Sequence, residues 1–175
     1  KMKITLSKKI NDNDHLVVVS IKGDTILKSN DLDLDSKEIL RDFLKKNKDR
    51  TEVFETFHFK SSKRIKSLTL VKIKNFADDY KFEGLGGRLL NYLEKKRIKK
   101  FSLLIEELKT SFHSYFPAII RGIALKNYKF EKYKTISKKD FSVESLQIIN
   151  KLDKIHKSQK NQITSINNLK GIFLT

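Results

Sequence analysis

The sequence contains no cysteine, and its 175 residues include a single proline. Without cysteine, neither a disulfide framework nor a thiolate zinc site can form, and nothing favours an oxidising compartment. Every apolar run is shorter than the roughly 18 residues that a membrane span needs, and the N-terminus lacks the apolar core of a signal peptide. These absences predict a cytoplasmic protein with no membrane partner.

Positive charge dominates the sequence. The 38 Lys and Arg residues oppose 21 Asp and Glu residues, which gives a formal net charge of +17. Such an excess favours non-specific binding to DNA, because bound cations release counterions from the phosphates. Only six of the basic residues are Arg, however, and Arg is the residue that makes bidentate contacts with phosphate and guanine. Because the lysines are dispersed, we interpret them mainly as solvated surface residues and keep DNA binding as an alternative.

Residues that could bind a metal are scattered along the chain. The four histidines are His15, His58, His113 and His156. None of them forms a metal-binding pair such as H-x-x-x-H. Asp31, Asp33 and Asp35 alternate with leucines but lack the Gly and the terminal Glu of a calcium loop, so they predict a solvated approach to a helix. The sequence therefore predicts no catalytic, cofactor-binding or metal-binding residue in this chain.

Two motifs raise the question of acid–base chemistry or anion binding. Glu106 and Glu107 follow an apolar run at the position where α/β folds place ligands. Adjacent strand residues point to opposite faces, which argues against a joint acid–base role. Gly84, Gly86 and Gly87 precede an expected helix, where backbone N–H groups can bind phosphate. Their spacing matches neither a P-loop nor a dinucleotide-binding motif, so we favour close packing of a helix against a strand or a capping turn.

Short β-rich runs alternate with amphipathic helical runs, which indicates a layered α/β domain. We expect strands over 2–6, 15–21, 53–59, 67–73, 101–105 and 141–149. We expect helices from a cap at Asp35 or Ser36 to about 46, from the glycines to about 95, from about Pro117 to Tyr128, and from 152 onward. The apolar run 16–19 suits a strand buried on both faces, and the passage from 67–73 through the glycines to 101–105 suits a parallel crossover.

Residues 117–135 read PAIIRGIALKNYKFEKYKT, an apolar helical run followed by an aromatic and basic tail. Aromatic rings between cations can stack nucleic-acid bases. Amphipathic rings just beyond a helix more often fasten the chain to its own core or to a neighbouring domain. We therefore interpret Tyr128–Lys134 as a structural clasp.

The tail resembles a signature of the leucyl (cytosol) aminopeptidases, in which it ends the last helix of the non-catalytic N-terminal domain. The matching residues are Leu125, Tyr128, Phe130, Tyr133, Lys134 and Thr135. Lys129 and Glu131 stand where the family usually has Arg and Asp. Residues 2–6 resemble the first strand of that family, 84–90 its Gly-rich helix start, and 163–175 the helix that leads into its peptidase domain.

The resemblance implies a three-layer α/β sandwich with a mixed, largely parallel sheet, similar to macro domains. It implies that 1–152 form the N-terminal domain and that 153–175 form a linker helix leading to a C-terminal peptidase domain that this sequence does not contain. Members of the family release N-terminal amino acids, often Leu, from peptides. They use two divalent cations, zinc with manganese or magnesium, held in the peptidase domain.

The expected function is therefore a structural or assembly role within a metallo-aminopeptidase, with the chain alone not an enzyme. The expected partners are the peptidase domain of the same polypeptide and the other subunits of a homo-hexamer. The alternative is a stand-alone basic module that binds nucleic acid or, because macro domains bind it, an ADP-ribose-like ligand.

Overall fold

The computed structural model describes residues 2–10, 15–59, 65–74, 78–108, 112–133, 141–149 and 161, without the side chains of 79, 112–114 and 129–133. The elements run in the order β1 (Lys3–Ser7), β2 (His15–Ser20), α1 (Asp24–Leu27), α2 (Leu34–Lys46), β3 (Glu52–His58), β4 (Ser67–Ile73), α3 (Asp79–Lys95), β5 (Lys100–Ile105), α4 (Phe112–Tyr133) and β6 (Ser145–Ile149). The alternation of strands and helices confirms the predicted α/β class. The expected turn at 11–14 and the domain boundary at 152/153 lie outside the described residues, as does the helix from 152 except for residue 161, which is helical.

The six strands form one sheet in the order β1-β6-β5-β2-β4-β3. Along this order, the first five strands pair parallel with their neighbours. The last strand, β3, pairs antiparallel with β4. This arrangement confirms a mixed, largely parallel sheet. Strand β6 begins later than the predicted 141, because its first residue, Ser145, pairs with Lys100 at the start of β5.

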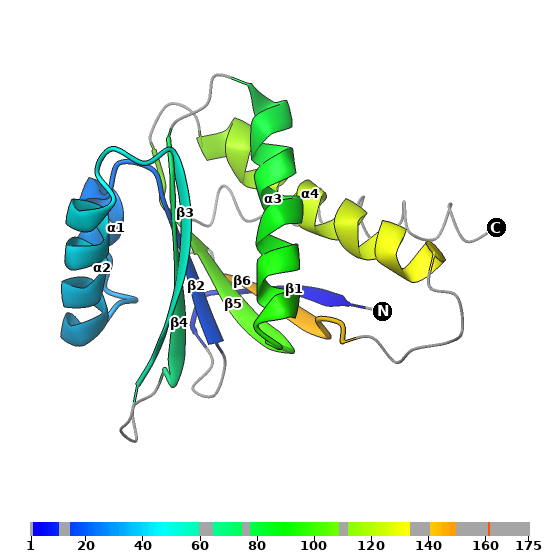
Figure 1. The fold of residues 1–175 in the computed structure, drawn as a ribbon, viewed down its shortest axis with the longest axis horizontal. Helices are drawn as coiled ribbons and strands as arrows, with labels where there is room; N and C mark the ends of the chain where they lie inside the picture. Colours follow the sequence, from blue (N-terminus) through cyan, green and yellow to red (C-terminus); the bar gives the residue numbers. More distant parts are fainter. Residues whose placement is uncertain are drawn as a thin grey trace.

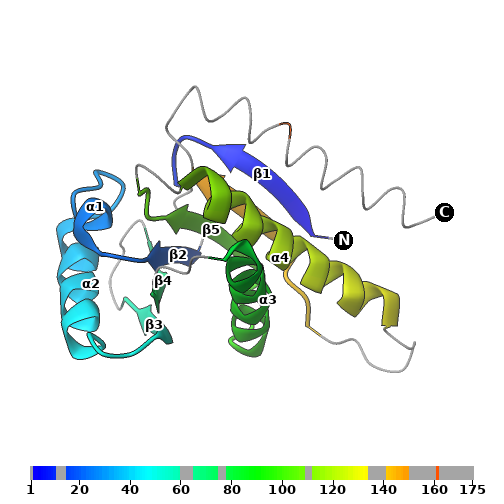
Figure 2. The ribbon, with the colours of Figure 1, turned by 90° about the horizontal axis from the view of Figure 1, so that it is seen from above.

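Helices cover both faces of the sheet, so the domain is a three-layer sandwich (Figures 1 and 2). Strand β2 shows why: all of its residues are buried. Leu16 and Val18 belong to the core that includes Leu40 of α2. Val17 and Val19 belong to the core beneath α3 and α4. A strand with apolar side chains on both faces needs a helical layer on each side.

The glycines do not precede helix α3, as predicted, but lie within it. Asp78 caps the helix, and its side chain accepts a hydrogen bond from the backbone N–H of Tyr80 at 2.9 Å. The N–H groups of Gly84 and Gly86 therefore lie inside a helix, where such groups bond to carbonyls one turn earlier. The capping turn that we favoured, and the phosphate-binding alternative, both require glycines at the start of a helix and are therefore wrong.

Helices α3 and α4 touch through two of their glycines. A Cβ atom added at Gly86 would lie 2.1 Å from the carbonyl oxygen of Ile119, and one added at Gly122 would lie 1.9 Å from that of Glu83. Only a residue without a side chain permits backbones to approach so closely. The predicted close packing of a helix against a strand is therefore wrong: the glycines bring two helices together.

Helix α4 extends beyond the predicted 117–128 at both ends. It begins at Phe112, so that Pro117 lies inside it, because Tyr115 and Phe116 are buried in the core and hold the preceding turn in place. It continues to Tyr133 because no Gly or Pro follows Gly122 to end it. The tail is therefore helical from Tyr128 to Tyr133. None of the helices among the described residues is sufficiently long and apolar to cross a bilayer.

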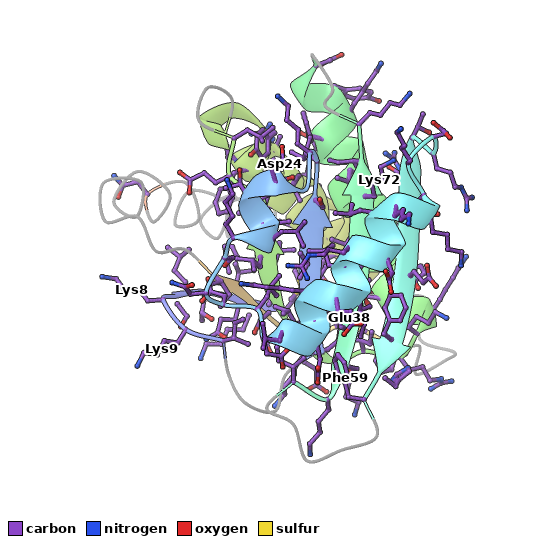
Figure 3. All side chains as sticks on the ribbon, turned by 90° about the vertical axis from the view of Figure 1, so that its left-hand side faces the viewer. Lys8, Lys9, Asp24, Glu38, Phe59 and Lys72 are labelled. Carbon is purple, nitrogen blue, oxygen red and sulfur yellow. The ribbon has the colours of Figure 1, made fainter. Side chains whose placement is uncertain are left out.

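Both ends of α2 are held by polar side chains. The N-cap is Asp33, not Asp35 or Ser36 as predicted, and its carboxylate accepts a hydrogen bond from the backbone N–H of Ser36 at 2.7 Å. At the other end, the Lys72 ammonium of β4 donates to backbone carbonyls of the turn that follows the helix, including Lys48 at 2.7 Å. In Figure 3, Lys72 lies beside this end of α2. A cation there complements the helix dipole.

Candidate functional site

The carboxyl ends of β2 and β5 form the part of the sheet most suited to a ligand. The two strands are parallel neighbours. The chain leaves β2 toward α1 and α2 on one face, and leaves β5 toward α4 on the opposite face (Figure 1). Where consecutive connections diverge in this way, open α/β sheets have a crevice that binds ligands.

In this protein the side chain of Glu106 lies between the ends of these two strands, where it bonds to the chain that follows β2. Glu106 follows β5 directly, and none of its surface is exposed to solvent. Its Oε2 atom accepts hydrogen bonds from the backbone N–H groups of Ile21 at 2.5 Å, Lys22 at 2.7 Å and Gly23 at 3.0 Å. The Oε1 atom accepts from the backbone N–H of Thr25 at 3.3 Å. The carboxylate thus accepts hydrogen bonds from three backbone amides of the loop between β2 and α1 and from one in the first turn of α1.

The loop takes this shape because Gly23 adopts a left-handed conformation with a φ of 90°. A Cβ atom at this position would also lie 2.7 Å from the Leu44 side chain of α2. Side chains rarely adopt this backbone conformation, so glycine is the residue that can turn the chain here. The turn directs successive N–H groups toward a single point, as backbone anion-binding loops do.

A buried tyrosine fixes the backbone on the other side of Glu106. The hydroxyl of Tyr115 in α4 donates to the carbonyl oxygen of Glu106 and accepts from the backbone N–H of Leu108 at 2.9 Å. Burial is the main cause that raises the pKa of Tyr115 above its usual value, so the phenol remains protonated at physiological pH. Glu106 is consequently fixed at two points: its carboxylate by the loop amides and its backbone carbonyl by the Tyr115 hydroxyl.

The arrangement can hold one negative charge in a buried position. It is not arranged for acid–base work on an outside substrate, because the Glu106 carboxylate is enclosed. Glu107 is partly exposed whereas Glu106 is buried, and both follow the end of β5, so the expected alternation within a strand does not apply to them. The partners of Glu106 were not predicted from the sequence. The signal that could have found them is Gly23, which follows an apolar strand at Lys22-Gly-Asp-Thr25.

Of the histidines, His15 is buried at the start of β2, at the opposite end of the strand from Glu106. Its Nδ1 atom lies 2.6 Å from the Ser67 hydroxyl, and its Nε2 atom lies 2.5 Å from the Thr69 hydroxyl. Burial, with a smaller contribution from His58, lowers the pKa of His15 to about 4. The ring is therefore neutral at physiological pH. His58 is exposed at the end of β3, and the side chains of His113 and His156 lie outside the described residues.

The hydroxyl of Thr69 continues the hydrogen-bond chain across the sheet. It lies 2.9 Å from the hydroxyl of Thr56 on β3, which lies 3.0 Å from the phenol oxygen of Tyr92 on α3. The Tyr92 ring in turn stacks on Phe54, with ring centroids 5.3 Å apart. These partners satisfy the buried polar groups of this region, which is the ordinary requirement for polar side chains in a core.

The three aspartates before α2 do not converge. Asp33 caps the helix, Asp31 accepts from the Ser29 hydroxyl at 3.2 Å, and Asp35 lies exposed in the first helical turn. The predicted approach to a helix is confirmed. Within the ranges that the structure describes, no three His, Asp or Glu side chains are grouped to bind a metal ion.

The predicted clasp is only partly within the described residues. The Tyr128 side chain is half-buried. The side chains of Phe130 and Tyr133 and all of Lys134 and Thr135 lie outside the described part. The clasp remains a prediction for a segment whose backbone is helical as far as Tyr133.

No protein-family model and no curated protein sequence matches this chain. Among solved structures, a tomato leucine aminopeptidase mutant matches 98% of this chain with a TM-score of 0.59 and 10% sequence identity. The match covers 36% of the tomato chain, so the present chain spans about a third of the length of that protein. At this identity the likeness shows that the two share a fold over nearly all of the present chain.

Proposed function

We propose that this chain is the non-catalytic N-terminal domain of a metal-dependent leucyl aminopeptidase, in which it has a structural or assembly role. The observation that carries the proposal is the shared fold with about a third of the tomato leucine aminopeptidase. The aminopeptidase-like signature from Leu125 to Thr135 supports it independently, because it is a sequence feature. The parent protein would be a cytoplasmic hydrolase that releases N-terminal amino acids, often Leu, from peptides.

In this proposal the chemistry belongs to a peptidase domain of the same polypeptide. Two divalent cations there, zinc, manganese or magnesium, would polarise the scissile carbonyl and activate water. The partners of this chain would be that peptidase domain and the other subunits of a homo-hexamer.

Sequencing the transcript beyond the codon for Thr175 tests this function. We expect the reading frame to continue through an Arg-Asp-Leu stretch into a peptidase domain, and the whole product to hydrolyse a leucyl amide when manganese or zinc is added. The 175-residue chain, assayed beside it, should show no turnover. Metal-dependent turnover by the purified chain alone would contradict the proposal, as would a reading frame that encodes no peptidase domain.

The charge of +17 supports a second candidate function, the binding of nucleic acid. On the described surface, the Lys96 ammonium lies 5.6 Å from the centre of the Tyr92 ring, so a cation and an aromatic group occur together. We expect any DNA binding to be non-specific. Its affinity should fall by at least about tenfold between 50 and 200 mM salt, because the lysines displace counterions. Fluorescence anisotropy with two unrelated duplexes measures this, and tight binding to one duplex at 200 mM salt would favour a dedicated DNA-binding role.

A further inference from the structure

We propose that the backbone amides of residues 21–23 form an oxyanion site, which the Glu106 carboxylate occupies as a built-in ligand and so closes to outside anions. Three successive N–H groups converge on one oxygen atom, Oε2, at distances from 2.5 to 3.0 Å. Successive amides that converge in this way create a concave site that favours negative charge. The donors come from the loop after β2 and the carboxylate from the residue that follows β5, far along the sequence, so the pairing is a product of the fold.

The complete burial of the Glu106 side chain supports this assignment independently of the loop geometry. Glu106 is a completely buried residue with an ionisable side chain, and glutamate is almost never fully buried without a partner. In the described part of the chain, no Lys or Arg side chain lies within ion-pair distance of it. The loop amides, together with the more distant Ser20 hydroxyl at 3.5 Å, are what offset its burial.

Because of where it lies, the bond between Glu106 and the loop amides should prevent other anions from binding there. It lies at the carboxyl ends of β2 and β5, where a phosphate or carboxylate ligand of an open α/β sheet would be held. An outside anion can reach these amides only by displacing Glu106. The native protein should therefore leave phosphate and ADP-ribose unbound at this loop, whether or not the aminopeptidase proposal holds.

Removal of the carboxylate should open the site. Glu106→Ala deletes a group equivalent to acetate, so acetate is the size-matched probe. We expect this variant to melt about 5 °C lower than the native protein in sodium chloride. Sodium acetate at about 100 mM should restore about 4 °C if the dissociation constant is about 10 mM, because ligand binding stabilises the folded state. Phosphate at equal ionic strength tests whether the opened site accepts a tetrahedral anion.

Two controls separate specific rescue from general salt effects. The native protein and the Glu107→Ala variant should melt at the same temperature in acetate and in chloride of matched ionic strength. Equal melting temperatures of Glu106→Ala in acetate and chloride would overturn the proposal. A shift of the 21–25 amide resonances of the native protein on addition of ADP-ribose would also overturn it, because the loop would then be open to outside ligands.

A second variant covers the outcome in which Glu106→Ala does not fold in either salt. Glu106→Gln keeps the shape but places an amide, which has its own N–H donors, among backbone donors. We expect the amide protons of Ile21, Lys22 and Gly23 to exchange at least about tenfold faster in this variant than in the native protein. Exchange rates equal to the native ones would show that the carboxylate is not the ligand of the loop.

Discussion

Gly122→Ala and Gly86→Ala should each destabilise the domain by about 3 kcal/mol or more, which corresponds to a fall of about 10 °C in melting temperature. The added methyl group has no space: it would lie 1.9 Å from the Glu83 carbonyl oxygen in the first variant and 2.1 Å from that of Ile119 in the second. Both obstacles are backbone atoms, which cannot rotate away. Helices α3 and α4 would have to separate, and the core beneath them would lose its close packing.

Gly87→Ala provides the matched control, because this glycine lies in the same helix and next to Gly86. A Cβ atom there would meet only ordinary contacts, the nearest being the Lys126 Cβ at 3.8 Å. Alanine is the better helix former, so this variant should be stabilised by about 0.5–1 kcal/mol. Thermal unfolding of the three variants measures the contrast. If all three changed stability alike, the effect would come from helix propensity and the proposed contact between the helices would be wrong.

Acidification should remove about 3 kcal/mol of stability through His15 alone, because its pKa is about 4 in the folded protein against 6.5 as the ordinary value. The unfolded chain binds a proton at His15 below pH 6.5, whereas the folded protein resists binding it until about pH 4. The stabilising contribution is therefore fully present above pH 6.5 and is lost as the pH falls toward 4. From pH 7 to pH 5 the expected loss is about 2 kcal/mol.

Urea unfolding of the native protein and of His15→Gln at several pH values isolates this contribution. Gln can still bond to the hydroxyls of Ser67 and Thr69, but it does not titrate. The variant should lack the loss of about 2 kcal/mol between pH 7 and pH 5. His58→Gln, at an exposed position, should retain most of it. Identical pH dependence in the native protein and His15→Gln would contradict the lowered pKa of His15.

Elements with a strong local pattern were predicted closely. Strand β2 was recognised by its unbroken apolar run, β3 and β4 by their alternation, and β5 by its apolar residues after a basic run. The predicted start of helix α3 at the glycines was wrong, because glycine is a poor helix former and was therefore placed at the end of a helix and not within it. The better signal was Asp78, a capping residue before the helical spacing of Phe82, Leu85 and Leu89.

For the candidate site, the sequence placed Glu106 at the ligand-binding edge of the sheet but could not find what it binds. The partners are backbone N–H groups of residues 21–25, and every residue type except proline carries this group. The residue types in a loop therefore do not reveal that its backbone N–H groups will converge on a carboxylate. Only the left-handed turn at Gly23 marks the loop, and a single glycine is a weak signal.

By itself the hydrophobic pattern determined the layered α/β class and a strand buried on both faces, because hydrophobic periodicity is a local property of the chain. The three-layer sandwich with a largely parallel sheet was implied by the resemblance to the leucyl aminopeptidases. The tertiary structure alone decided that two glycines allow α3 and α4 to touch, that α4 begins before Pro117, and that Glu106 bonds to the backbone amides after β2. Each of these features depends on atoms from parts of the chain that are distant in sequence. Those atoms meet because the helical layers pack on the sheet, and the residue pattern of a single helix or strand does not specify that packing.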